Sequence, residues 1–236
     1  GRHSLDFQDF LDYSKRVKNN SVEAFFALLR AGLWERDVEL RNYGTTDFSE
    51  ILQLATEQSV VGLIAAGLEH VKDVKVPQEW TLQFIGQILQ IEQRNRAMNE
   101  FIADTIEGMR KAGIYSLLVK GQGIAQCYER PLWRASGDID FFLSEDNYDK
   151  ARLCLLEHSL GNKPERIYSK EQGMNIDTWY VEVHGTQRTG LSTRIDATLD
   201  RVQQRIFFDG NVRSWMNDRT QVFMPAPTED VFIVFT

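Results

Sequence analysis

The run Gly137-Asp138-Ile139-Asp140-Phe141-Phe142-Leu143 is the stretch that decides how the second half of this chain folds. Its last five residues are apolar apart from Asp140, and they predict a buried strand. Side chains two apart on a strand project from the same face, so Asp138 and Asp140 point the same way, with Cα atoms roughly 7 Å apart. Two carboxylates on one face repel each other unless a cation lies between them. Mg²⁺ takes one or two carboxylates together with substrate phosphates, so the pair is a candidate magnesium site.

An Asp-x-Asp pair taken alone is also typical of a solvated strand edge. The apolar residues that follow it favour a central strand, whose first residues are not ordinary surface. A calcium-binding EF-hand loop does not fit, because Phe142 and Leu143 stand where such a loop needs Asp or Asn and then Gly.

A glycine-rich turn precedes this strand at Val119-Lys120-Gly121-Gln122-Gly123, between an apolar run at 115–119 and an expected helix. Glycines let a phosphate approach the backbone, and a helix N-terminus offers free N–H groups to it. Lys120 adds a point charge. The pattern matches neither the P-loop nor the Rossmann fingerprint. Ordinary turn chemistry is the alternative for this segment.

A third feature is Tyr180-Val181-Glu182-Val183-His184, which alternates polar and apolar residues as a strand does. Glu182 and His184 share one face, and the two valines share the other. Glu182 is a candidate third metal ligand or a base for an attacking hydroxyl. The wet face of an antiparallel edge strand is the alternative. Asp196 is a reserve candidate, ranked lower because it falls inside an expected helix with Asp200.

The chain divides by pattern into a helical region, 1–112, and a region of strands alternating with helices, 113–236. In the first region we expect helices at 22–33, at 51–71 after an Asp47 cap, and at 77–109, with Gly113 as the stop. In the second we expect strands at 115–119, 139–143, 178–184 and 222–224, and helices at 145–158 and 192–207. The predicted class is therefore α+β (α/β-like).

Composition excludes several classes of protein. The 236 residues carry a net charge of −7 and 42% hydrophobic residues, which is ordinary for a globular chain and excludes intrinsic disorder as its main state. The net negative charge argues against a nucleic-acid partner, because it repels a phosphate backbone. The two cysteines, Cys127 and Cys154, form no Cys-x-x-Cys pair, and neither has a histidine at the spacing of zinc ligands. A disulfide scaffold and a zinc ribbon are therefore excluded.

The ends of the sequence and its compartment also carry expectations. No apolar run reaches the roughly 18 residues of a membrane span, and no signal peptide is evident, so we expect a cytoplasmic protein without a membrane partner. Residue 1 is Gly, and the apolar run at 230–236 reads as an element that stops midway, so we expect the natural chain to continue.

These three features in this order resemble the nucleotidyltransferase fold of the polymerase-beta-like superfamily. More closely, the chain is similar to a group of uncharacterised bacterial nucleotidyltransferases with a Lys-Gly turn, a Tyr-Pro-Arg-Asp-x-Asp pattern and a Glu-x-His strand. The matching residues are Leu117 to Gly121, Tyr128, Pro131, Arg134, Gly137 to Asp140 and Val181 to His184. One position departs, because Gln122 stands where the superfamily has Gly or Ser.

The resemblance implies an N-terminal helical region followed by a small mixed-sheet nucleotidyltransferase-like domain. It implies that Asp138 and Asp140 hold two Mg²⁺ ions and that Glu182 completes the catalytic set. The phosphates of a nucleoside triphosphate would be held by Lys120, Gly121, Gln122, Gly123 and Arg134. His184 would orient Glu182 or touch the substrate.

The implied reaction moves a nucleoside monophosphate to a hydroxyl of a small molecule or a protein and releases pyrophosphate. Two alternatives stay open at this point. One is a catalytically degenerate protein that binds a nucleotide or a partner. The other is a kinase-like phosphotransferase that uses the same carboxylates.

Overall fold

The structure, a computed structural model, describes residues 19–234 and divides them into two compact units. The first unit contains the described residues up to 95 together with 132–135, and the second contains 96–131 and the described residues from 136 onward. The expected domain division at residue 112 stays a prediction, because compactness does not show which part folds by itself. Along residues 19–234, no helix is both long enough and apolar enough to cross a membrane.

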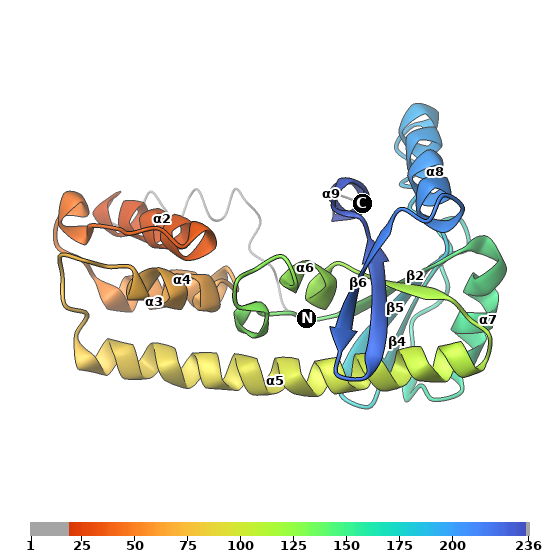
Figure 1. The fold of residues 1–236 in the computed structure, drawn as a ribbon, viewed down its shortest axis with the longest axis horizontal. Coiled ribbons are helices and arrows are strands. Elements are labelled where there is room, and N and C mark those ends of the chain that lie inside the picture. The colour runs from red at the N-terminus through yellow and green to blue at the C-terminus, as the bar shows by residue number, and fades with distance from the viewer. Residues whose placement is uncertain (1–18, 235–236) are drawn as a thin grey trace. The chain divides into compact units, whose positions relative to one another are not determined.

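The first unit is built from helices (Figure 1). Its elements are α2 (Asn19–Trp34), the 3₁₀ turn η1 (Leu40–Tyr43), α3 (Phe48–Glu57), α4 (Val61–Glu69) and the first half of the long helix α5 (Gln78–Lys111). The Asp47 cap is confirmed, since its carboxylate accepts hydrogen bonds from the backbone N–H groups of Ser49 and Glu50. Buried apolar side chains such as Phe25, Leu28, Ile51 and Ile64 form one core in this unit.

The single helix expected over 51–71 is wrong, because α3 and α4 are separated at Ser59. Ser59 has a φ of 57°, in the left-handed region. Its N–H bonds to the carbonyl of Thr56, and the N–H of Val60 bonds to that of Ala55. This is the Schellman ending of a helix, which glycine usually provides. Because a serine occupies this position, the sequence does not indicate that a helix ends here.

The second unit contains a five-stranded sheet and a separate hairpin, so the α+β class is confirmed. The sheet has the order β1-β2-β5-β4-β3, in which β2 pairs parallel with β5 and the other neighbours pair antiparallel. Its strands are β1 (Ser116–Val119), β2 (Ile139–Leu143), β3 (Gly161–Asn162), β4 (Glu171–Ile176) and β5 (Trp179–His184). The strand expected at 222–224 lies instead in the hairpin, formed by β6 (Val212–Asn217) and β7 (Thr220–Pro225).

The helices of this unit are α6 (Gly121–Ala125), α7 (Glu145–Leu156), α8 (Thr193–Phe207) and α9 (Pro227–Val234), together with the second half of α5. The 3₁₀ turn η2 (Pro131–Trp133) precedes β2 in the chain, and its last two residues belong to the first unit. The two faces of the sheet enter different cores. Ile139, Phe141 and Val181 pack with α5 and α7, whereas Phe142 packs with residues of α8 and α9. Asp140, Glu182 and His184 alternate with the first group and therefore belong to the second face.

Close backbone contact between α2 and α4 requires a glycine in the first unit. A Cβ atom added at Gly67 of α4 would overlap the backbone carbonyl of Leu28 in α2. Gly86 of α5 is a matched comparison, because a Cβ atom there meets nothing within 4 Å.

We therefore expect Gly67→Ala to lower the free energy of unfolding by about 1–3 kcal/mol, as overpacking does. Gly86→Ala should raise it by roughly 0.5–1 kcal/mol, because alanine costs less backbone entropy in a helix. Urea denaturation followed by circular dichroism measures both changes. Equal effects of the two substitutions would contradict the contact between the helices.

Candidate metal centre

The parallel pairing of β2 with β5 brings two of the predicted carboxylates together. In this register Asp140 lies opposite Glu182 and Phe142 lies opposite His184. β2 is buried at all five positions, so its backbone is firmly placed between β1 and β5. Asp140 itself has 7% of its surface exposed. A carboxylate this buried needs a charged or hydrogen-bonding partner.

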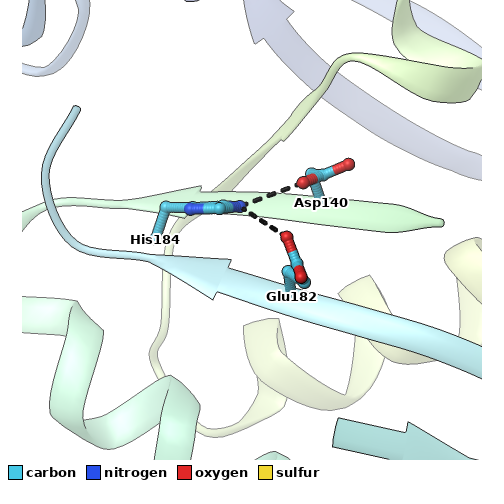
Figure 2. A group of neighbouring side chains, drawn as sticks. All are labelled: Asp140, Glu182 and His184. Carbon is cyan, nitrogen blue, oxygen red and sulfur yellow. Dashed lines mark hydrogen bonds and ion pairs between the residues drawn. The ribbon is translucent and has the colours of Figure 1, made fainter. Parts of the chain in front are cut away.

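His184 is that partner. Its Nε2 lies 3.0 Å from Asp140 Oδ1 and 3.7 Å from Glu182 Oε2. Figure 2 shows the three side chains turned toward one another, Asp140 from β2 and the other two from β5. The imidazole is itself buried, with 8% of its surface exposed, whereas Glu182 is half-buried and reaches solvent on one side. The group therefore lies just under the surface of the sheet face.

The donor set of this group fits a divalent cation. Asp140, Glu182 and His184 each offer one ligand atom, and these atoms lie within 4.8 Å of one another. Carboxylate oxygens suit Mg²⁺ and Mn²⁺, and an imidazole nitrogen adds affinity for transition metals such as Mn²⁺. Mn²⁺ is therefore a suitable probe ion for this site.

Asp138 stands at the edge of this group. It is exposed, comes directly before β2, and is outside the three-residue cluster. Extending the β2–β5 register by one residue places it beside Tyr180, on the same face as Glu182. Its assignment as a metal ligand stays a prediction.

The turn after β1 lies next to the start of β2. Lys120 has a φ of 56° with a ψ of −149°, and Gly121 has a φ of 27°. Both φ angles are positive. Glycine adopts such a backbone conformation freely, whereas a residue with a side chain loses roughly 1–3 kcal/mol of stability in it. A Cβ atom at Gly121 would lie 3.1 Å from the carbonyl oxygen of Asp138. The turn thus approaches the predicted acidic residues closely.

Gln122 is directed into the protein. Its side chain is 2% exposed, and its Nε2 donates a hydrogen bond to Met98 Sδ at 3.5 Å. Gly123 is also buried. Any contact of Gln122 with a phosphate would therefore come from its backbone and not from its amide. The predicted role of these two residues in binding a nucleotide is untested.

Arg213 of β6 binds the backbone of the glycine turn at Gly123. Its guanidinium donates hydrogen bonds to the carbonyl oxygens of Gly123 at 3.2 Å and Pro225 at 3.1 Å, and it forms an ion pair with Asp230 of α9 at 2.8 Å. Burial raises the pKa of the Asp230 carboxyl, and Arg213 opposes that shift. The separate hairpin and α9 therefore support the glycine turn.

Arg134 belongs to the first unit. It lies in the segment 132–135, which Asn95 fixes by donating to the carbonyl oxygens of Leu132 and Arg134 at 2.7 and 2.8 Å. The Arg134 guanidinium donates to the carbonyl of Ala135 at 3.4 Å. Its role as a phosphate ligand remains a prediction.

Asp196, the reserve candidate, binds the backbone of the loop at Thr189 and Gly190. Its Oδ1 accepts hydrogen bonds from the backbone N–H groups of Thr189 at 2.9 Å and Gly190 at 3.3 Å and from the Thr189 hydroxyl at 3.2 Å. The backbone hydrogen bond from Thr189 is the main cause that lowers the pKa of this carboxyl. Asp196 is thus committed to the loop that follows β5.

Two neighbours of the site were missed by the sequence analysis. Tyr180 lies on the same face of β5 as Glu182 and His184, a placement that the alternation already contained. The ammonium of Lys163 lies 4.5 Å from the centre of the Tyr180 ring. Lys163 comes from the far edge of the sheet, and nothing in the local sequence links it to Glu182.

One comparison with known proteins gives a match. A family model described as an uncharacterised nucleotidyltransferase matches residues 44–223. This span includes the glycine turn, Asp138, Asp140, Glu182 and His184. No curated protein and no solved structure matches the chain significantly.

We expect the protein to bind Mn²⁺ at the Asp140–Glu182–His184 group. Asp140→Asn keeps the shape of the side chain but removes its charge, so the affinity for Mn²⁺ should fall at least tenfold, the lower end of the effect of changing an outer-shell partner. Electron paramagnetic resonance of free Mn²⁺ measures this affinity. Asp149→Asn removes an exposed charge from α7 and should leave the affinity unchanged; an equal loss in both variants would contradict the site.

We also expect Asp196→Asn to destabilise the protein in a pH-dependent way. Because folding lowers the pKa of Asp196 below its ordinary 3.8, its stabilisation is present above that pH and is lost as the pH falls through the folded value. The difference in the free energy of unfolding between wild type and variant should therefore be largest near pH 7 and shrink below pH 3.8. Urea denaturation at several pH values measures it, and a difference that grows in acid would refute the assignment.

Proposed function

This chain belongs to the family of uncharacterised nucleotidyltransferases, and we propose that it transfers a nucleoside monophosphate from a nucleoside triphosphate to an acceptor hydroxyl with the help of Mg²⁺. The hydroxyl gives its proton to water, and its oxygen bonds to the α-phosphorus. The bond from that phosphorus to the bridging oxygen breaks, and pyrophosphate leaves. The observation that carries the proposal is the convergence of Asp140, Glu182 and His184 within the matched span.

The proposed ligands of the metal are Asp138, Asp140 and Glu182, in line with the resemblance noted from the sequence. When bound, two Mg²⁺ ions would neutralise phosphate charge and favour loss of pyrophosphate. His184 acts on Asp140, because its Nε2 lies 3.0 Å from that carboxylate and holds its orientation. We propose it as a positioning residue.

The triphosphate is proposed to lie against the turn after β1. Lys120 supplies a positive charge, and the backbone of Gly121, Gln122 and Gly123 supplies N–H groups. Arg134, in the first unit, is assigned to the phosphates from the resemblance alone. The support is the close approach of Gly121 to the carbonyl of Asp138, which places this turn at the start of β2. A wider relationship to the polymerase-beta-like superfamily is part of the same proposal, as is an acceptor that is a small molecule or a protein.

Nucleotide binding should depend on the two aspartates. A nucleoside triphosphate with Mg²⁺, at a hundredfold excess over its dissociation constant, should raise the free energy of unfolding by about 2.7 kcal/mol. Without Mg²⁺, or in Asp138→Ala plus Asp140→Ala, this gain should disappear. Thermal-shift measurements test it, with Asp146→Ala plus Asp149→Ala on α7 as the charge-matched control. A gain that survives in the aspartate variant would indicate a degenerate nucleotide-binding protein.

The type of transfer is tested with ATP labelled in one of two positions and a cell extract as the source of acceptor. Label at the α-phosphate should pass to the acceptor, with release of pyrophosphate. Transfer of the γ-phosphate with release of ADP would indicate a kinase-like reaction and refute the proposal.

A further inference from the structure

The face of β5 that carries the metal centre continues to Tyr180. Side chains alternate along a strand, so Tyr180, Glu182 and His184 point to one side. The Tyr180 ring is half-buried, and its hydroxyl oxygen is buried without a hydrogen-bond partner among the described residues. A tyrosine hydroxyl of this kind normally finds a partner, which makes this position unusual.

The neighbouring strand leaves room for that ring. Gly173 of β4 lies opposite Glu182, and a Cβ atom there would overlap the Tyr180 hydroxyl. The next strand therefore places no side chain between Glu182 and the edge of the sheet. The Tyr180 side chain instead occupies the space over Gly173.

The side chain of Lys163, the residue after β3, extends over the Tyr180 ring. Its backbone N–H donates to the carbonyl of Gly173 at 2.9 Å, so its Cα lies about two strand spacings, or about 10 Å, from that of Glu182. Its ammonium lies 4.5 Å from the centre of the Tyr180 ring. The positive charge is thus held on the face that carries the metal centre.

The charge of Lys163 is available to a ligand. Lys163 is exposed and forms no ion pair within residues 19–234, whereas nearby Arg166 is engaged with Glu171 at 3.1 Å. A lysine ammonium keeps its proton at neutral pH, because its ordinary pKa is about 10.4. The lysine therefore stays positive while water still reaches it.

Lys163 and the glycine turn lie on opposite sides of the metal centre. The turn follows β1, and Lys163 follows β3, at the two ends of the order β1-β2-β5-β4-β3. The metal centre on β2 and β5 lies between them: the turn reaches it from the β1 side, against the carbonyl of Asp138, and the Lys163 ammonium reaches it from the β3 side, over the Tyr180 ring. If the turn holds the nucleotide, the side with Lys163 faces the other substrate.

We propose that Lys163, held over Tyr180 beside Glu182, binds an anionic group, a phosphate or a carboxylate, on the acceptor molecule. The inference rests on the proposed function, because the acceptor side is defined by where the nucleotide lies. It narrows the acceptor to hydroxyl compounds that carry a negative charge near the reacting hydroxyl.

The test uses the full chain with ¹³C-labelled lysine, with the Lys163 resonance assigned through Lys163→Arg. Inorganic phosphate is titrated into protein saturated with Mg²⁺ and a non-reactive ATP analogue, with glycerol as the uncharged probe. The Lys163 signal should move and saturate with phosphate, stay still with glycerol, and stay still when the analogue is added alone. In Lys163→Ala the phosphate affinity, followed on the Tyr180 ring, should fall about tenfold or more, as expected for a charged hydrogen bond.

Controls separate this inference from the proposed function. Lys150→Ala removes an exposed lysine from α7, on the other face of the sheet, and should leave phosphate affinity unchanged, while Lys163→Arg should retain most of it. Movement of Lys163 with the analogue alone would assign the charge to the triphosphate and overturn the proposal. The proposal would also be overturned if the Lys163 signal did not saturate with phosphate. An equal loss of phosphate affinity in Lys150→Ala and Lys163→Ala would overturn it as well. If the analogue leaves the Lys120 signal unmoved and gives no thermal shift, the proposed function fails, whatever Lys163 shows with phosphate.

Discussion

The parallel pairing of β2 with β5 is the constraint on which the candidate site depends. It sets Asp140 opposite Glu182 and brings the His184 imidazole to 3.0 Å from the Asp140 carboxylate. A shift of this register by one residue would turn one set of side chains to the opposite face and separate the three. The apolar residues between them, such as Ile139 and Val181, enter the core on the other side and so fix the register.

Much of this site follows from local patterns. The alternation in 137–143 and 180–184 correctly identified two strands and the face that their polar residues share. Gly113 ends α5 with a φ of 73°, as its position in the sequence predicted. Patterns of this kind are reliable because the spacing of side chains along a strand or helix depends on the backbone alone.

Other features depend on partners distant in the sequence. β4 escaped prediction because Glu171, Gly173 and Asn175 make it look polar, although pairing with β5 buries most of its residues. The direction of the Gln122 side chain was equally unpredictable, because its amide donates to Met98 of α5 in the interior. Lys163 lies near Tyr180 because its backbone bonds to β4, and no local pattern encodes that pairing. In each case tertiary contacts decided the outcome.

The hydrogen bond between His184 and Asp140 joins residues 44 apart in the chain. Closing such a loop costs chain entropy before the contact returns any stabilisation, so pairings of this kind form late and slowly during folding. The intervening segment includes α7, β3 and β4, and all of it must be synthesised and placed first. A nascent chain therefore acquires the geometry of the candidate metal centre only when β2 and β5 pair and the sheet is completed.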